Sequence, residues 1–121
     1  MTQPTLKIKR VYLPAEESDG YRILIDRLWP RGMNKTQAHI DRWEKTLAPS
    51  TTLRQWFGHR PERFAEFSRR YESELRTNPA FDALLQDLCQ QSTVTLLYAA
   101  KDEQHNNAAV LQQVLQKAIA T

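Results

Sequence analysis

Two short polar segments of this chain carry the side chains best suited to chemistry. The first, DRLWPRG, spans residues 26–32, and the second, KDEQHNN, spans residues 101–107; each follows an apolar run. Each segment holds a carboxylate, Asp26 or Asp102, that could act as a general base or orient a substrate. The remaining candidates would bind the ligand through charge or hydrogen bonds: Arg27, Arg31, Lys101, Asn106 and Asn107.

The apolar runs before these segments predict two buried strands, over residues 21–26 and 93–99. The chain between them is long enough for a parallel crossover. Because ligands bind outside the carboxyl ends of parallel strands, both polar segments are expected to line one concave site. The last helix, expected to begin between Asp102 and Asn107, would add free backbone N–H groups that favour an anion.

Helix signals fill the chain between the two strands. Thr36 is a suitable N-cap for a helix that carries Ile40, Trp43 and Leu47 on one face. Further starts are expected at Ser50, at Pro61 and at Asn78-Pro79, and Gly58 and Pro49 are expected to end helices.

A first strand is expected over residues 6–11, where apolar and polar residues mostly alternate. The loop over residues 13–20 is short for a parallel crossover, so this strand could pair antiparallel or lie at an edge. The predicted fold is α/β: a small, largely parallel sheet with helices packed on it, in a single domain over residues 1–121.

Composition excludes several classes of protein. The chain has 121 residues, 40% of them hydrophobic, which is enough for a core without disulfides. The single cysteine, Cys89, excludes an internal disulfide and a cysteine-based zinc site, and three scattered histidines make a weak case for a metal. Three glycines are too few for a phosphate-binding glycine loop. No secretory signal or membrane span is expected, so the predicted location is cytoplasmic, with no membrane partner; no cofactor can be named.

The charge suggests an anionic partner. The formal net charge is +3, and 11 arginines outnumber six lysines, mostly in the first two thirds of the chain. The leading hypothesis is an enzyme or binding domain for a phosphorylated or nucleotide-like small molecule. An alternative is a nucleic-acid-binding module in which Trp29 or Trp56 stacks on bases. Its phosphate contacts would be Arg22, Arg27, Arg31, Lys35, Arg42, Lys45 and Arg54. A third possibility is a protein–protein adaptor without chemistry.

Each candidate residue also has a structural interpretation. Asp26 and Arg27 could form an ion pair at a strand end, and residues 30–32 could be only a turn. Asp102, Asn106 or Asn107 could do no more than cap the last helix.

The motif YRILIDRLWPRG at residues 21–32 resembles the YeaO-like branch of a domain-of-unknown-function family, number 488 in that series. The resemblance continues through WEK at 43–45, APS at 48–50, and TLLYAAKD at 95–102. It also includes Leu53-Arg54, Phe67, Tyr71, Glu74-Leu75 and Asn106-Asn107-Ala108. It covers nearly the whole chain and implies a compact α/β domain, but it supplies no function.

Longer members of that family look as if they place an Asp-x-Arg at the end of one strand, and two cysteines with a His-Arg after another. This chain lacks the second motif: Tyr98 stands near the position of the first cysteine, and Asn106-Asn107 near that of the Cys-His pair. No cysteine-based mechanism carries over.

Overall fold

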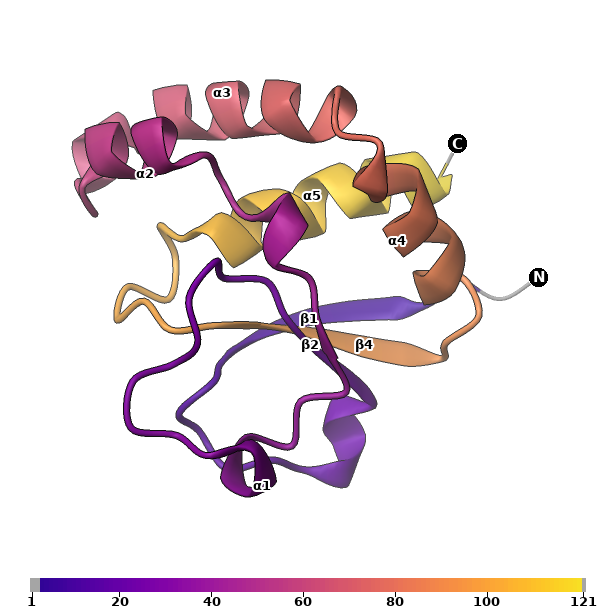
Figure 1. Ribbon diagram of the computed structural model, residues 1–121. Coiled ribbons are helices and arrows are strands. Elements are labelled where there is room, and N and C mark those ends of the chain that lie inside the picture. The colour runs from indigo at the N-terminus through magenta and orange to yellow at the C-terminus, as the bar shows by residue number, and fades with distance from the viewer. Residues whose placement is uncertain (1–2, 121) are drawn as a thin grey trace.

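Four parallel strands form the sheet, in the order β1-β4-β2-β3. In the computed structural model, which describes residues 3–120, β4 lies between β1 and β2 (Figure 1). The strands are β1 (Thr5–Arg10), β2 (Tyr21–Leu24), β3 (Arg42–Trp43) and β4 (Thr93–Tyr98). The expected parallel sheet is confirmed, and all four carboxyl ends point to one edge.

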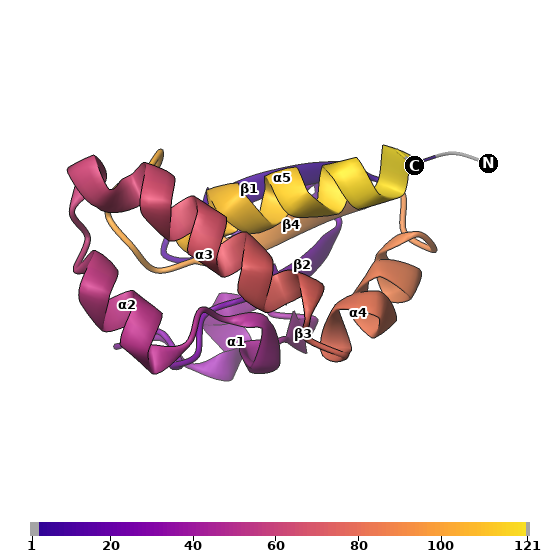
Figure 2. The same ribbon diagram turned by 90° about the horizontal axis from the view of Figure 1, so that it is seen from above.

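Helices α2, α3 and α5 cover one face of the sheet, and the short α1 lies on the other side (Figures 1 and 2). The helices are α1 (Lys35–Ala38), α2 (Thr51–Phe57), α3 (Phe64–Arg76), α4 (Ala80–Leu88) and α5 (Asn107–Ala120). Single turns of 3-10 helix are η1 (Glu17–Asp19), η2 (Lys45–Leu47) and η3 (Pro61–Arg63). No helix among residues 3–120 is both long and apolar enough to cross a membrane.

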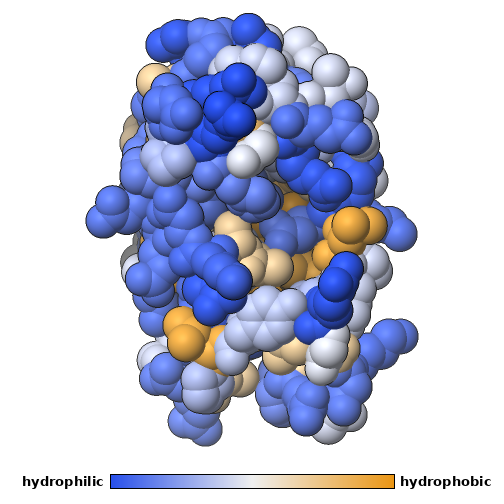
Figure 3. All heavy atoms as spheres, turned by 90° about the vertical axis from the view of Figure 1, so that its left-hand side faces the viewer, coloured by the Kyte–Doolittle hydropathy of each residue, from blue (hydrophilic) through white to orange (hydrophobic). Residues whose placement is uncertain are grey.

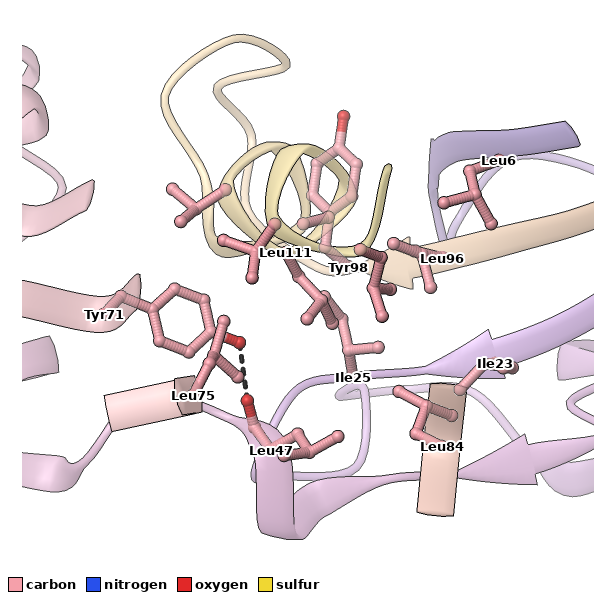
Figure 4. Close-up of a cluster of buried hydrophobic side chains, with 14 of the residues drawn as sticks. Leu6, Ile23, Ile25, Leu47, Tyr71, Leu75, Leu84, Leu96, Tyr98 and Leu111 are labelled. Atoms are coloured by element: carbon pink, nitrogen blue, oxygen red, sulfur yellow. Dashed lines mark hydrogen bonds between the residues drawn. The ribbon is translucent and has the colours of Figure 1, made fainter. Parts of the chain in front are cut away.

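The two-residue period of the strands divides their apolar side chains between two cores. On the helix-covered face, Ile23 and Leu96 pack with Tyr71 and Leu111, all fully buried (Figure 4). The Tyr71 hydroxyl donates to the carbonyl of Leu47 at 2.5 Å, so this buried polar group is satisfied.

The opposite face holds a smaller apolar cluster and a buried ionic group. Val11, Leu24 and Leu97 form the cluster, and each is 0% exposed. Next to it, Asp19 accepts from Lys9 at 3.1 Å and from Arg22 at 2.5 Å. This contact anchors the connection between β1 and β2 over the face of the sheet.

Strand β1 lies at the edge and runs parallel to β4, so the antiparallel alternative is wrong. Residues 11–20 suffice for the crossover to β2 because the strands are short. A six-residue strand rises only about 20 Å, and ten extended residues span about 33 Å.

The helix expected to start at Thr36 and to include Ile40, Trp43 and Leu47 is also wrong. Asn34 caps α1, accepting from the Gln37 N–H at 2.7 Å, and the chain leaves the helix at His39. Residues 42–43 instead extend the sheet as β3. The apolar spacing was misleading because Ile40 packs in the smaller cluster while Leu47 lies in the main core.

Other helix ends match the sequence signals. Ser50 caps α2 by accepting from the Leu53 N–H at 3.2 Å, and Gly58 ends it with a φ of +53°. Asn78 accepts from the Ala80 N–H at 2.9 Å at the start of α4. The sequence signals therefore mark both ends of α2 and the start of α4.

Candidate functional site

A cavity of about 450 Å³ opens at the carboxyl ends of β1, β2 and β4. Figure 3 views this side of the molecule and shows apolar side chains around a hollow, ringed by hydrophilic ones. The lining residues are Tyr12, 26–31, Ala48, Pro49, Arg54, Phe57, His59, Phe67, Ala99, Ala100, Asn106 and Asn107. Its volume lies within the range of roughly 300–1,000 Å³ that is usual for small-molecule pockets.

Asp26 joins the two polar segments at this cavity. Its Oδ2 accepts from the Ala99 N–H at 2.9 Å, and its Oδ1 accepts from the Asn107 side-chain amide at 2.9 Å. The side chain is partly buried. The structure thus brings a residue after β2 into contact with the end of β4 and the first residue of α5.

The pKa of Asp26 is raised above its ordinary value. Burial raises it, and this outweighs the opposing hydrogen bonds from Asn107 and Ala99 and the positive charges of Arg54 and His59. A carboxylate in this setting gains from a ligand that supplies further N–H donors or positive charge.

Three arginines and a histidine line the same cavity as this one carboxylate. Arg27 donates to the carbonyl of Pro49 at 3.1 Å, which fixes its guanidinium beside the start of α2. Among residues 3–120, the guanidinium groups of Arg31 and Arg54 hydrogen-bond to no other group, and both side chains are exposed. The cavity therefore presents an excess of positive charge with free donors.

The segment after β2 is held in place by its aromatic residues. The Trp29 indole N–H donates to the carbonyl of Met33 at 2.7 Å, and that of Trp43 donates to the carbonyl of Asp26 at 2.7 Å. The two indoles meet edge to face at 5.4 Å. The Tyr12 hydroxyl donates to the carbonyl of Arg31 at 3.0 Å, which completes the fixation of residues 26–33.

The opposite wall comes from α2 and α3. Phe57 and Phe67 stack with their ring centres 4.3 Å apart. His59 follows α2 with a φ of +57°, directly after Gly58 at +53°. Sequence reasoning did not place Tyr12, His59 or either phenylalanine at this cavity, and it named Arg54 only as a phosphate contact of the nucleic-acid alternative. The predicted cap at Ser50 indicated a helix here, but it did not predict that this helix would pack beside the cavity.

Lys101 and Asp102 do not line the cavity, unlike the other five predicted site residues. Asp102 Oδ1 accepts from the N–H groups of Gln104 and His105, both at 2.9 Å, and its Oδ2 meets His105 Nδ1 at 2.9 Å. These bonds lower its pKa to about 2. Asp102 therefore orders the loop before α5 and does not cap the helix itself.

Asn106 lines the cavity but is also the cap of α5. Its Oδ1 accepts from the Ala109 N–H at 2.8 Å, and its Nδ2 donates to the carbonyl of Asp102 at 2.9 Å. Both polar atoms are thereby engaged, and the residue is 2% exposed. Asn107, by contrast, makes its only side-chain hydrogen bond within residues 3–120 to Asp26. Asn106 therefore caps α5, whereas Asn107 holds the carboxylate of Asp26.

The arginine stripe of the nucleic-acid alternative is interrupted. Arg22 is 4% exposed and paired with Asp19, and Arg42 is paired with Glu44 and Asp87. Trp56 has the guanidinium groups of Arg63 and Arg70 over its ring, at 5.1 and 4.4 Å. Two of the seven arginines and lysines proposed to contact phosphates are therefore already paired with carboxylates. One of the two tryptophans proposed to stack on bases is already covered by arginines.

Among the residues that the structure describes, the cavity lining has no serine, threonine, cysteine or lysine. Cys89 lies elsewhere, at the end of α4. Within residues 3–120, no group of three His, Cys, Asp or Glu side chains is placed to hold a metal ion. The lining that the structure describes offers charged and hydrogen-bonding groups: three arginines, one histidine and one aspartate.

The fold and the cavity define a small parallel α/β domain with a cation-rich pocket at the carboxyl ends of its strands. The chain belongs to the family DUF488-N3i, described as "Inactive DUF488-N3 subclade", whose model matches residues 5–121.

Two relatives cover most of the chain. The "Uncharacterized protein YeaO" of Escherichia coli (strain K12) is 46% identical over 106 residues, covering 88% of this chain and 92% of the relative. The "Uncharacterized protein Rv3073c" of Mycobacterium tuberculosis (strain ATCC 25618 / H37Rv) is 42% identical over 110 residues, covering 91% and 92%. No solved structure matches the chain. The expected YeaO-like resemblance is confirmed.

Proposed function

We propose that this protein binds a small phosphorylated molecule in the cavity at the carboxyl ends of β2 and β4, and that it binds this molecule without turning it over. The observation that carries the proposal is the set of Arg27, Arg31 and Arg54 around one cavity of small-molecule size. Guanidinium groups match phosphate oxygens in geometry and charge.

The helix above the cavity supports an anion in the same place. α5 begins at Asn107, which lines the cavity, and it runs for 14 residues. The N-terminus of such a helix carries a partial positive charge and unsatisfied N–H groups. These add to the field of the three arginines.

Binding without turnover is favoured by the lining itself. Within residues 3–120, Asp26 is the one acidic residue of the lining, and both of its oxygens already accept hydrogen bonds. Among residues 3–120, the lining has no serine, threonine, cysteine or lysine that could attack a substrate. The word "Inactive" in the family description agrees with this proposal.

The protein is expected to bind ribose 5-phosphate measurably and ribose much more weakly in isothermal titration calorimetry. Arg31→Ala and Arg54→Ala should each weaken phosphate binding about tenfold or more, because each removes a charge-assisted contact. Arg76→Ala is the matched control, since Arg76 is an exposed arginine outside the cavity.

Salt separates this proposal from the nucleic-acid alternative. A single phosphate in the pocket should lose little affinity between 50 and 200 mM salt, whereas an oligonucleotide held by several phosphates loses affinity steeply. Equal affinity for ribose and ribose 5-phosphate, or wild-type affinity in both cavity variants, would contradict the proposal. Tight oligonucleotide binding with a steep salt slope would replace it.

A further inference from the structure

We propose that the ligand is a nucleoside monophosphate whose base presents two adjacent N–H donors to Asp26, as guanine does, while its phosphate lies among the arginines. The inference rests on the proposed function and adds the identity of the end of the ligand that enters the cavity.

The cavity has an acidic group in its partly buried part and basic groups at its exposed rim. Asp26 is partly buried and sits against the ends of β4 and α5. Arg31 and Arg54 are exposed at the surface. A ligand that satisfies both ends needs a hydrogen-bond donor at its leading end and an anion at its trailing end.

The carboxylate of Asp26 has acceptor positions left for two further hydrogen-bond donors. A carboxylate has about four lone-pair sites, two on each oxygen. Oδ1 uses one for Asn107 and Oδ2 uses one for Ala99. One acceptor position remains on each oxygen, and the proposal assigns these two positions to a pair of N–H groups on the ligand. Guanine offers such a pair in its N1–H and its 2-amino group, whereas hypoxanthine lacks the amino group.

The walls between the two ends suit a flat ring. Phe57, Phe67 and Trp29 all line the cavity, and Phe57 and Phe67 stack on each other. Aromatic walls favour a planar partner through offset or edge contacts. A phosphorylated amine without a ring would satisfy the charges but leave this apolar surface uncovered.

His59 adds a polar group to the same wall. It lines the cavity, and its backbone is held in the left-handed region, which places this residue at the turn between α2 and η3. Its ring lies 6.3 Å from that of Phe57. An imidazole at this position can donate to a ribose hydroxyl or a phosphate oxygen.

The test is a calorimetric series on the wild-type protein with guanosine 5′-monophosphate, inosine 5′-monophosphate, ribose 5-phosphate and guanosine. The guanine nucleotide should bind about tenfold or more tightly than the inosine nucleotide and than ribose 5-phosphate, because each of these leaves an acceptor of Asp26 unpaired. Guanosine should bind more weakly than its monophosphate.

The matching variants are Asp26→Asn and Glu103→Gln. Asp26→Asn should abolish the preference for guanine over hypoxanthine, measured as the ratio of the affinities for the two nucleotides. Glu103→Gln should leave both unchanged, because Glu103 is exposed and does not line the cavity. If Asp26→Asn does not fold by circular dichroism, the wild-type series alone decides.

The possible failures differ between the two proposals. Equal affinity for the guanine nucleotide and ribose 5-phosphate, or for the guanine and inosine nucleotides, overturns the inference about the base and leaves the phosphate site standing. Equal affinity for guanosine and its monophosphate overturns the phosphate site. Absence of binding by all four compounds at millimolar concentration overturns both.

Discussion

The side-chain amide of Asn107 donates to Asp26 Oδ1 at 2.9 Å, across a sequence separation of 81 residues. Asp26 follows β2 and Asn107 begins α5, so the contact ties the end of the sheet to the helix over it. The same carboxylate accepts from the Ala99 N–H, which also fixes the end of β4. Asp26 therefore organises the cavity that it lines.

Replacing Asn107 tests the strength of this tie. Asn107→Ala should lower the free energy of unfolding by about 1.5 kcal/mol, because a hydrogen bond to a charged, partly buried group is lost. Urea denaturation followed by circular dichroism measures the change. Gln113→Ala on the exposed side of α5 is the control and should have little effect. Equal, small losses for both variants would show that the amide contributes nothing to stability.

The sheet and the cavity differ in what they contribute to stability. Leu97 is 0% exposed in the centre of β4, so Leu97→Ala should cost about 2–5 kcal/mol through lost burial and a cavity. Arg31 is exposed at the rim, and Arg31→Ala should change stability by about 0.5 kcal/mol or less. Denaturant titrations of both variants check this difference. A large loss in Arg31→Ala would reveal a structural role for that side chain.

The pairing of Asp26 with Asn107 follows from a rule that the sequence can apply. Two buried runs, each followed by polar residues, predict strands whose carboxyl ends meet if the strands are parallel. That step required no side-chain detail. The position of Asp102 before the last helix suggested a cap, but Asn106 caps α5, and Asp102 bonds within the preceding loop.

The other wall depends on packing that the sequence pattern does not encode. α2 reaches the cavity because the Ser50 N–H and hydroxyl donate to Glu74 of α3, at 2.8 and 2.6 Å. Ser50 and Glu74 are 24 positions apart, and neither residue type predicts that the two will be in contact. β3 was missed for a related reason: a two-residue edge strand is too short to show a period, and its bonds to β2 come from backbone groups.

Asp102 predicts a dependence of stability on pH. Its pKa is lowered to about 2, first by the hydrogen bond from the His105 N–H and then by that from Gln104. A lowered carboxylate pKa stabilises the fold above the unfolded pKa, and this contribution is lost as pH falls from 3.8 to about 2. The stability advantage of the wild type over Asp102→Asn should therefore narrow across this window in thermal unfolding measured at each pH.

Asp26 contributes to the same pH dependence with the opposite sign. Because the pKa of Asp26 is raised, the folded state holds the proton of this carboxyl more tightly than the unfolded state does. The stability that protonated Asp26 contributes is therefore lost as the pH rises through its folded-state pKa. Comparing the wild type with Asp102→Asn cancels this effect, because both proteins contain Asp26. An advantage that stays constant down to pH 2 would mean that the hydrogen bonds to Asp102 do not depend on its charge.

The left-handed backbone at His59 predicts that a glycine there would increase stability but weaken ligand binding. His59 has a φ of +57°, and a left-handed residue other than glycine costs about 1 kcal/mol. His59→Gly should therefore stabilise the protein by about that amount in urea denaturation, while binding of ribose 5-phosphate weakens because the imidazole is lost from the cavity. His39 is the matched control, since its φ is +48° and it lies outside the cavity. His39→Gly should raise stability by a similar amount and leave binding unchanged. If His59→Gly binds ribose 5-phosphate as tightly as the wild type does, the imidazole takes no part in the site and the conformation serves only the turn after α2.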